Sequence, residues 1–162
     1  MEQIELRTLF RFYDEEVNKY LKEDRFVPDK DQALKTVSQA IYWGVMLFDF
    51  CRKSNNQRFD NHIMDCKLSG LKKGIIYARN RVTHQFPHLL KITDGAILSA
   101  PLPSPFFEIA WKNIDELPDP DPKYDSQSQR DRYTENLAGI PVRFAFDQLN
   151  DLFLKILEDE NF

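Results

Sequence analysis

Proline residues divide this chain into parts that can form long helices and one part that cannot. The chain has 162 residues and nine prolines, and most of them lie between residues 87 and 140: Pro87, Pro101, Pro103, Pro105, Pro118, Pro120 and Pro122. Proline lacks a backbone N–H, and its ring clashes with the preceding helical turn. We therefore expect long helices only before residue 87 and after residue 140, with Pro28 separating the first helix from the second.

Apolar residues recur at helical spacing in the segments outside this proline-rich part. The first predicted helix has about five turns and ends before Pro28. Asp29 and Gln32 form a capping-box pattern that begins the second helix, and a third helix is expected from about Phe59 to Phe86. The fourth begins at Pro141. The buried side of the second helix is predicted to hold Ala33, Val37, Ala40, Ile41, Gly44, Val45 and Phe48, and that of the last helix Val142, Phe146, Leu149, Phe153 and Ile156 or Leu157.

Residues 87–140 are expected to form an insertion with short strands. Leu89–Ile92 and Ala96–Ser99 flank Asp94-Gly95, a dipeptide typical of two-residue hairpin turns. Residues 106–111 form a third predicted strand, whose aromatic residues either cover the core or offer a platform for stacking bases. A short helix over Gln127–Leu137, closed at Gly139, completes the insertion.

Together these elements predict a single domain spanning residues 1–162. A chain of this length with 42% hydrophobic residues can bury a substantial core. We expect a mainly α fold, namely a four-to-five-helix antiparallel bundle with a small β-hairpin and irregular insertion before the last helix.

The charge is unevenly distributed along the chain. The formal net charge is −4, which does not indicate nucleic acid or an anionic membrane as a partner. From Cys66 to Thr93, however, there is no acidic residue, and this basic band contains Lys67, Lys72, Lys73, Arg79, Arg81 and Lys91. Such a band favours an anionic ligand.

The two cysteines, Cys51 and Cys66, cannot form a disulfide framework and lack the paired spacing of a zinc site. His62 and Cys66 are four residues apart, but a surface histidine beside a half-buried thiol explains them better than a metal site. No segment approaches the roughly 18 apolar residues needed to span a bilayer. We expect a cytoplasmic protein in a reducing compartment, with no metal, cofactor or membrane partner.

Polar side chains gather on one side of the predicted third helix, close to its end. Its apolar stripe consists of Leu68, Leu71, Ile75, Ala78 and Val82. Lys73, Tyr77, Asn80 and His84 are expected to project from the face opposite this stripe, with Arg79 between the two faces. An anion near one helical turn could then meet both Arg79 and His84. A solvated polar face with no function explains the same pattern, and the spacing alone leaves both interpretations open.

The segment Arg79-Asn80-Arg81-Val82-Thr83-His84 resembles the motif of HEPN domains. That motif is an arginine, a polar residue and, after a few intervening residues, a histidine, carried on a helix of a four-to-five-helix bundle. The resemblance covers about six residues as sequence and most of the chain as helix order, although the insertion at 87–140 departs from the minimal bundle. Many HEPN proteins are metal-independent ribonucleases of toxin–antitoxin or phage-defence systems, and others are inactive.

The resemblance implies an endoribonuclease in which a 2′-hydroxyl attacks the neighbouring phosphate. Such a reaction needs a base, an acid and a cation facing the phosphorane, and one histidine cannot be base and acid in the same step. A homodimer that faces two third helices would supply two copies of His84 and Arg79, with Asn80 orienting His84 or a phosphate oxygen. Lys73, Tyr77 and Arg81 are expected to contact RNA, and an antitoxin protein is an expected partner. The alternative is a non-catalytic module that binds RNA, a nucleotide or an acidic protein.

Overall fold

The fold is described from a computed structural model that covers residues 2–26, 29–81, 86–94, 107–159 and 162. Among these residues it contains six α-helices: α1 (Glu2–Lys22), α2 (Lys30–Ser54), α3 (Asn56–Asp65), α4 (Ser69–Arg81), α5 (Gln127–Asn136) and α6 (Val142–Glu158). Two strands, β1 (Leu90–Asp94) and β2 (Phe107–Trp111), precede α5 and α6. The prediction of a mainly α fold with a small antiparallel strand pair before the last helix is confirmed.

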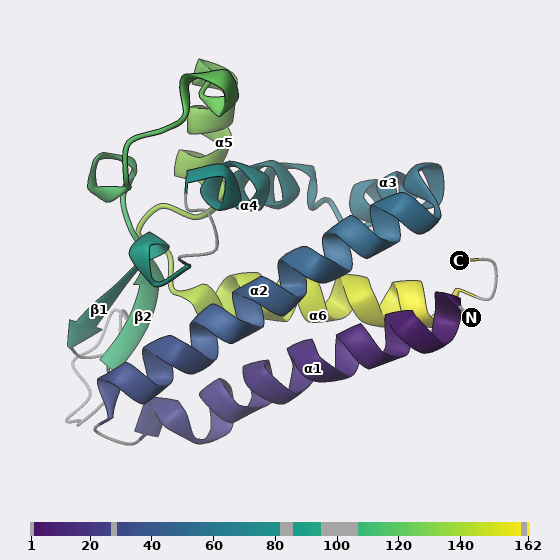
Figure 1. Cartoon of the computed structure of the whole chain (residues 1–162), viewed down its shortest axis with the longest axis horizontal. Helices are drawn as coiled ribbons and strands as arrows, with labels where there is room; N and C mark the ends of the chain where they lie inside the picture. Colours follow the sequence, from purple (N-terminus) through teal and green to yellow (C-terminus); the bar gives the residue numbers. More distant parts are fainter. Residues whose placement is uncertain (1, 27–28, 82–85, 95–106, 160–161) are drawn as a thin grey trace.

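The long helices α1, α2 and α6 form the body of the molecule, and α4 and α5 lie on the side of α2 away from α1 (Figure 1). The predicted apolar stripe of α2 is buried from Ala33 to Phe48. Of the two residues predicted for the last buried position of α6, Ile156 is buried and Leu157 is only partly buried. The Asp29 side chain accepts a hydrogen bond from the Gln32 backbone N–H, as the capping pattern predicted. Periodicity and capping therefore identified the helices of the body correctly.

The single third helix predicted over 59–86 is wrong, because the structure divides it into α3 and α4. The break is a Schellman motif: the Lys67 N–H donates to the Met64 carbonyl and the Leu68 N–H donates to the Ile63 carbonyl. Lys67 has a φ of 57°, a left-handed conformation that usually carries glycine at this position. Since a lysine occupies it, and Gly70 lies beyond it, the sequence lacks the usual signal of a helix end.

Replacing Lys67 by glycine is expected to stabilise the fold by roughly 0.5 to 1 kcal/mol, because glycine adopts positive φ without strain. Lys73→Gly is the matched control. Lys73 is an exposed residue inside α4, and there the same substitution is expected to destabilise by about 1 kcal/mol. Urea unfolding of both variants measures the two changes, and equal losses of stability would contradict a left-handed Lys67.

The insertion contains one described strand pair. β1 pairs antiparallel with β2, from Leu90 opposite Trp111 to Asp94 opposite Phe107, so β2 corresponds to the predicted third strand. Asp94, which was predicted to begin a two-residue turn, is instead the last residue of β1 and pairs with Phe107. Gly95 and the predicted strand 96–99 lie outside the described residues. Trp111 and Phe107 are both 2% exposed. Of the two roles weighed for these aromatic residues, covering the core is therefore the correct one.

The rest of the insertion packs against α4. A 3-10 helix, η3 (Ile114–Glu116), and a second, η4 (Pro122–Tyr124), lead to α5, which ends near Gly139 with its φ of 72° as predicted. The Tyr133 side chain of α5 is fully buried, and its ring centroid lies 5.7 Å from that of Tyr77 in α4. The α5 part of the insertion is thus packed in the structure and covers one side of the helix that carries Arg79.

Candidate functional site

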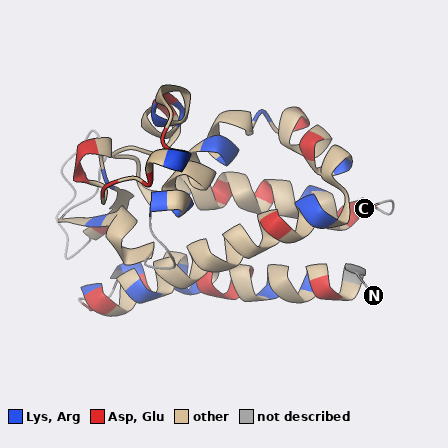
Figure 2. Cartoon of the chain, turned by 45° about the horizontal axis from the view of Figure 1, so that its top comes forward, with Lys and Arg blue, Asp and Glu red and all other residues tan. Residues whose placement is uncertain are grey.

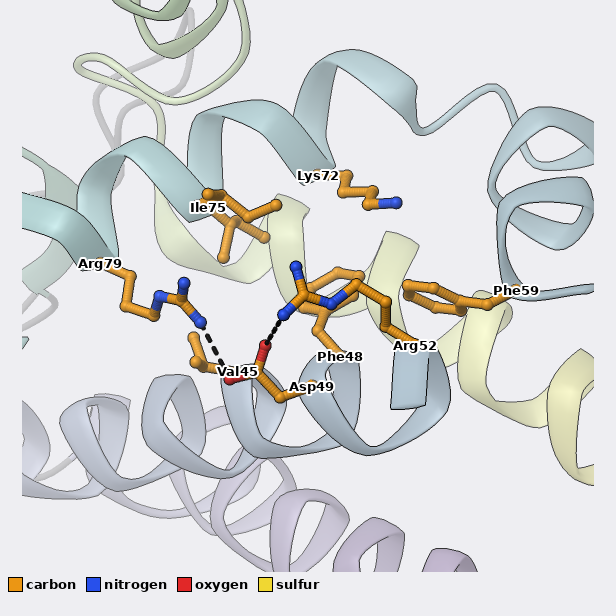
Figure 3. Close-up of a pocket in the computed structure, with 9 residues that line it drawn as sticks. Val45, Phe48, Asp49, Arg52, Phe59, Lys72, Ile75 and Arg79 are labelled. Atoms are coloured by element: carbon orange, nitrogen blue, oxygen red, sulfur yellow. Dashed lines mark hydrogen bonds and ion pairs between the residues drawn. The ribbon is translucent and has the colours of Figure 1, made fainter. Parts of the chain in front are cut away.

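Arg79, the first residue of the motif, is fixed between α4 and α2. Its Nη1 donates to Oδ2 of Asp49 at 2.9 Å, while Arg52 Nη2 lies 3.4 Å from Oδ1 of the same carboxylate. Figure 3 shows the two guanidinium groups approaching Asp49 from different helices. The side chains of Arg79 and Asp49 are 32% and 31% exposed. Two cations therefore share one anion at the surface, which leaves a local excess of positive charge with unused N–H donors.

The groove beneath this ion pair is packed too tightly for a small molecule. Val45, Phe48, Phe59 and Ile75 form its apolar floor, and Lys72 lies at its rim. The remaining cavity has a volume of about 10 Å³, close to the minimum for one water molecule. A ligand of Arg79 would therefore have to approach from outside the groove.

The structure brings together fewer of the predicted site residues than the sequence analysis expected. His84 lies outside the described residues, which stop at Arg81 and resume at Phe86. Asn80 is half-buried and Lys73 is exposed, and within the described parts of the chain neither side chain has a hydrogen-bond partner. Arg79, which was expected between the polar face and the apolar stripe, points to α2.

Tyr77 was expected on a solvent-facing side of the helix, and this is wrong. Its side chain is fully buried, and its hydroxyl donates to Oδ1 of Asp125 at 3.0 Å. The reason is that α5 covers the face of α4 opposite the core, which a single amphipathic helix would leave to water. In this structure the Tyr77 ring is not accessible to RNA.

Asp125 is held in its ionised form by two neighbours. Arg130 donates to both carboxylate oxygens, and this contact lowers the pKa of Asp125 to about 2. Burial, followed by the hydrogen bond to Asp125, raises the pKa of Tyr77 above its ordinary value. The Tyr77–Asp125–Arg130 network therefore fastens α5 to α4 as long as Asp125 carries its charge.

Acid is expected to weaken this attachment. A carboxylate with a lowered pKa in the folded state stabilises the fold above its ordinary pKa of 3.8 and loses that contribution as the pH falls toward about 2. Asp125→Asn should therefore have a lower Tm than the unchanged protein at pH 5, and the difference should shrink between pH 4 and pH 2. Asp65→Asn, at an exposed position of α3, is the control. A Tm difference for Asp125→Asn that stays constant down to pH 2 would contradict the network.

The basic band in the sequence is not a basic surface in the structure. Acidic residues from other segments pair with three of its six members: Asp49 with Arg79, Asp60 with Lys72, and Glu116 with Lys91. Figure 2 shows blue and red segments interspersed over the helices. An absence of acidic residues along the chain therefore did not predict the charge of the folded surface.

His62 and Cys66 each have a protein partner. The His62 Nε2 atom lies 2.8 Å from Asp159 Oδ2, and Lys155 Nζ lies 3.5 Å from Cys66 Sγ. In the described part of the chain, no group of three or more His, Cys, Asp or Glu side chains is placed to hold a metal ion.

Asp49 and Arg52 are the site residues that sequence reasoning missed. The available signal was an acidic residue between Phe48 and Phe50, in the half of α2 that is otherwise rich in apolar residues. Their contact with Arg79 depends on how α2 packs against α4, which no local pattern reports.

Across the described helices, none is both long and apolar enough to cross a membrane. In comparisons with protein-family models, curated proteins and solved structures, the chain has no match.

Proposed function

We propose that the chain is a metal-independent endoribonuclease of the HEPN type that works as a homodimer. Arg79 binds the phosphate at the cleaved bond, and His84 transfers protons to or from the reacting oxygens. Asn80 orients His84 or a phosphate oxygen. The observation that carries the proposal is the motif arginine, which is held at the end of α4 by Asp49 with N–H donors left for a phosphate.

Each chain supplies half of the reacting groups. Attack by the 2′-hydroxyl requires a base, and departure of the 5′-oxygen requires an acid. Two copies of His84 fill both roles, since an imidazole with an ordinary pKa near 6.5 is present in both protonation states at neutral pH. Arg79 stabilises the added negative charge of the phosphorane.

Among the described elements, those that pack on α4 leave one of its sides for the partner. Its Tyr77 side is covered by α5, and its Arg79 side lies against α2. Lys73 and Asn80 are two helical turns apart, so they lie on the same side of α4, and neither is buried. A twofold axis next to this side would bring the ends of two α4 helices together.

The ion pair between Arg79 and Asp49 also favours a second, non-catalytic function. Asp49 already neutralises part of the charge of Arg79, and such a pair also serves simply to join α2 to α4. The alternative is therefore a non-catalytic module that binds RNA, a nucleotide or a protein such as an antitoxin.

Labelled RNA incubated in EDTA distinguishes the two functions. The endoribonuclease proposal expects cleavage by the unchanged protein and its loss in His84→Ala. If neither protein cuts the RNA while both bind it, the nuclease proposal fails and the binding module remains.

Asp49 is expected to act as a positioning residue for Arg79. Asp49→Asn keeps the shape but removes the charge that holds the guanidinium, so we expect roughly tenfold slower cleavage at saturating RNA. RNA binding should tighten at low salt, because one negative charge near the phosphates is lost. Asp65→Asn makes the same change of charge at an exposed position of α3 and controls for net charge. Equal kcat values for the two variants would remove Asp49 from the mechanism.

A further inference from the structure

A second polar pocket lies between the end of α4 and the insertion. Its volume is about 380 Å³, within the range of about 300 to 1,000 Å³ typical of small-molecule sites. Arg81 lines one part of it, and α5 contributes Gln127, Arg130, Asp131 and Thr134. Arg79 points instead to Asp49 in α2 and does not line this pocket.

Arg81 has donors without acceptors. Its Nη2 makes only a long contact of 3.5 Å with the Ile114 carbonyl, and within the described chain its buried Nε and Nη1 atoms have no hydrogen-bond partner. The guanidinium carbon lies 5.2 Å from the centre of the Tyr77 ring, which supports the cation from one side. Buried donors in folded proteins almost always have partners. Both atoms are covered from solvent in this structure, so an oxyanion would supply the missing acceptors once the Arg81 side chain has turned toward the pocket.

Among the other charged residues that line the pocket, Arg130 already has a carboxylate partner, and Asp115 and Asp131 are negative. Arg130 is committed to Asp125, to which it donates through Nε and Nη2. Asp131 accepts a hydrogen bond from Gln127 Nε2 through Oδ1, at 2.8 Å. Among the described residues, Arg81 is therefore the one lining cation available for an anionic group of a ligand. The Asp131 carboxylate and the Thr134 hydroxyl can hydrogen-bond to the uncharged polar part of the same ligand. A ligand with more than one phosphate group would meet repulsion from Asp115 and Asp131.

We propose that this pocket binds a sugar phosphate, either free or as part of a nucleotide. The phosphate contacts Arg81, which matches its oxygens as a planar fork. Sugar hydroxyls donate to Asp131 and exchange hydrogen bonds with Thr134. The proposal does not depend on cleavage of RNA, because Asp131 and Thr134 have no role in that reaction and Arg81 was expected only to contact RNA, not to take part in catalysis.

Calorimetric titration of the full chain at low salt tests the proposal with four probes. Ribose 5-phosphate is expected to bind, and inorganic phosphate and ribose should each bind at least tenfold more weakly, since each carries only half of the recognised groups. AMP distinguishes the source of the ligand: tighter binding than ribose 5-phosphate assigns the pocket to nucleotides, and weaker binding assigns it to free sugar phosphates. No saturable binding of ribose 5-phosphate or AMP up to about 10 mM would overturn the proposal.

Variants connect the binding to the pocket. Arg81→Gln is expected to weaken ribose 5-phosphate at least tenfold, whereas Arg132→Gln, which removes a surface charge from α5 outside the pocket, should leave it unchanged. Equal affinities in these two variants would overturn the assignment. Thr134→Val, at an exposed position of α5, should weaken ribose 5-phosphate but not inorganic phosphate, and it stands as the test if Arg81→Gln does not fold. His84→Ala should bind as the unchanged protein does, so a failure of the nuclease proposal leaves this result intact.

Discussion

Replacing His84 by alanine is expected to lower the rate of RNA cleavage by about 10²- to 10⁴-fold, the range that general acid–base catalysis contributes. The loss should appear in kcat more than in KM, because the imidazole acts on protons in the transition state and Arg79 still binds the phosphate. Single-turnover cleavage of labelled RNA in EDTA, across a range of protein concentrations, measures both quantities.

His88→Ala is the matched control for this prediction. His88 lies four residues further along the chain, in the 3-10 helix η2 (Phe86–Leu89), and is exposed. Its loss should leave the rate unchanged. In mixtures of unchanged and His84→Ala chains, a site shared by two chains predicts less activity than the unchanged chains would give alone, because mixed dimers lack one imidazole. Activity that is strictly proportional to the unchanged fraction would argue against a shared site.

Replacing Glu108 by alanine is expected to destabilise the fold by about 3 to 5 kcal/mol, the range for breaking a buried ion pair from one side. Glu108 lies on β2 and is 1% exposed. Its Oε1 accepts a hydrogen bond from Arg25 Nη2 at 2.6 Å and lies 3.3 Å from Arg143 Nε. The carboxylate thus joins the strand pair to the segment that follows α1 and to the start of α6. Its removal would leave two mostly covered guanidinium groups without this carboxylate partner.

Urea unfolding of Glu108→Ala and Glu135→Ala measures this effect against a surface pair. Glu135 and Arg132 also form an ion pair, but both side chains are about half exposed, and such pairs contribute only about 0 to 1 kcal/mol. Glu108→Gln keeps the volume and is expected to fall between the two. If Glu108→Ala were no more destabilising than Glu135→Ala, the buried carboxylate would not hold these elements together.

The sequence predictions were most accurate where a structure depends on interactions between residues that are close together in the sequence. The buried stripe of α2, the Asp29 cap and the buried face of α6 were predicted correctly, because helical periodicity and capping depend on residues within a few positions of each other. The end of α3 was missed although it is also local. There a lysine occupies the left-handed position at which a glycine would have signalled the break.

The candidate site depended more on distant segments. The sequence identified Arg79 as a functional candidate, but its partner Asp49 comes from 30 positions earlier, and the same kind of contact neutralises Lys72 and Lys91. Tyr77 was placed wrongly because the residue that covers it, Tyr133, belongs to an insertion 56 positions further along the chain (133 minus 77).

The sequence by itself determined most of the helical segments, where proline prevents them, and where in the chain the Arg79-Asn80-x-x-x-His84 spacing lies. Only the tertiary structure decided which side of that helix meets α2, which side α5 covers, and which charges of the basic band are neutralised. The physical reason is that backbone hydrogen bonds and amphipathic spacing act between neighbours in the sequence. Burial and ion pairing act between neighbours in space, and these are known only once the helices have packed.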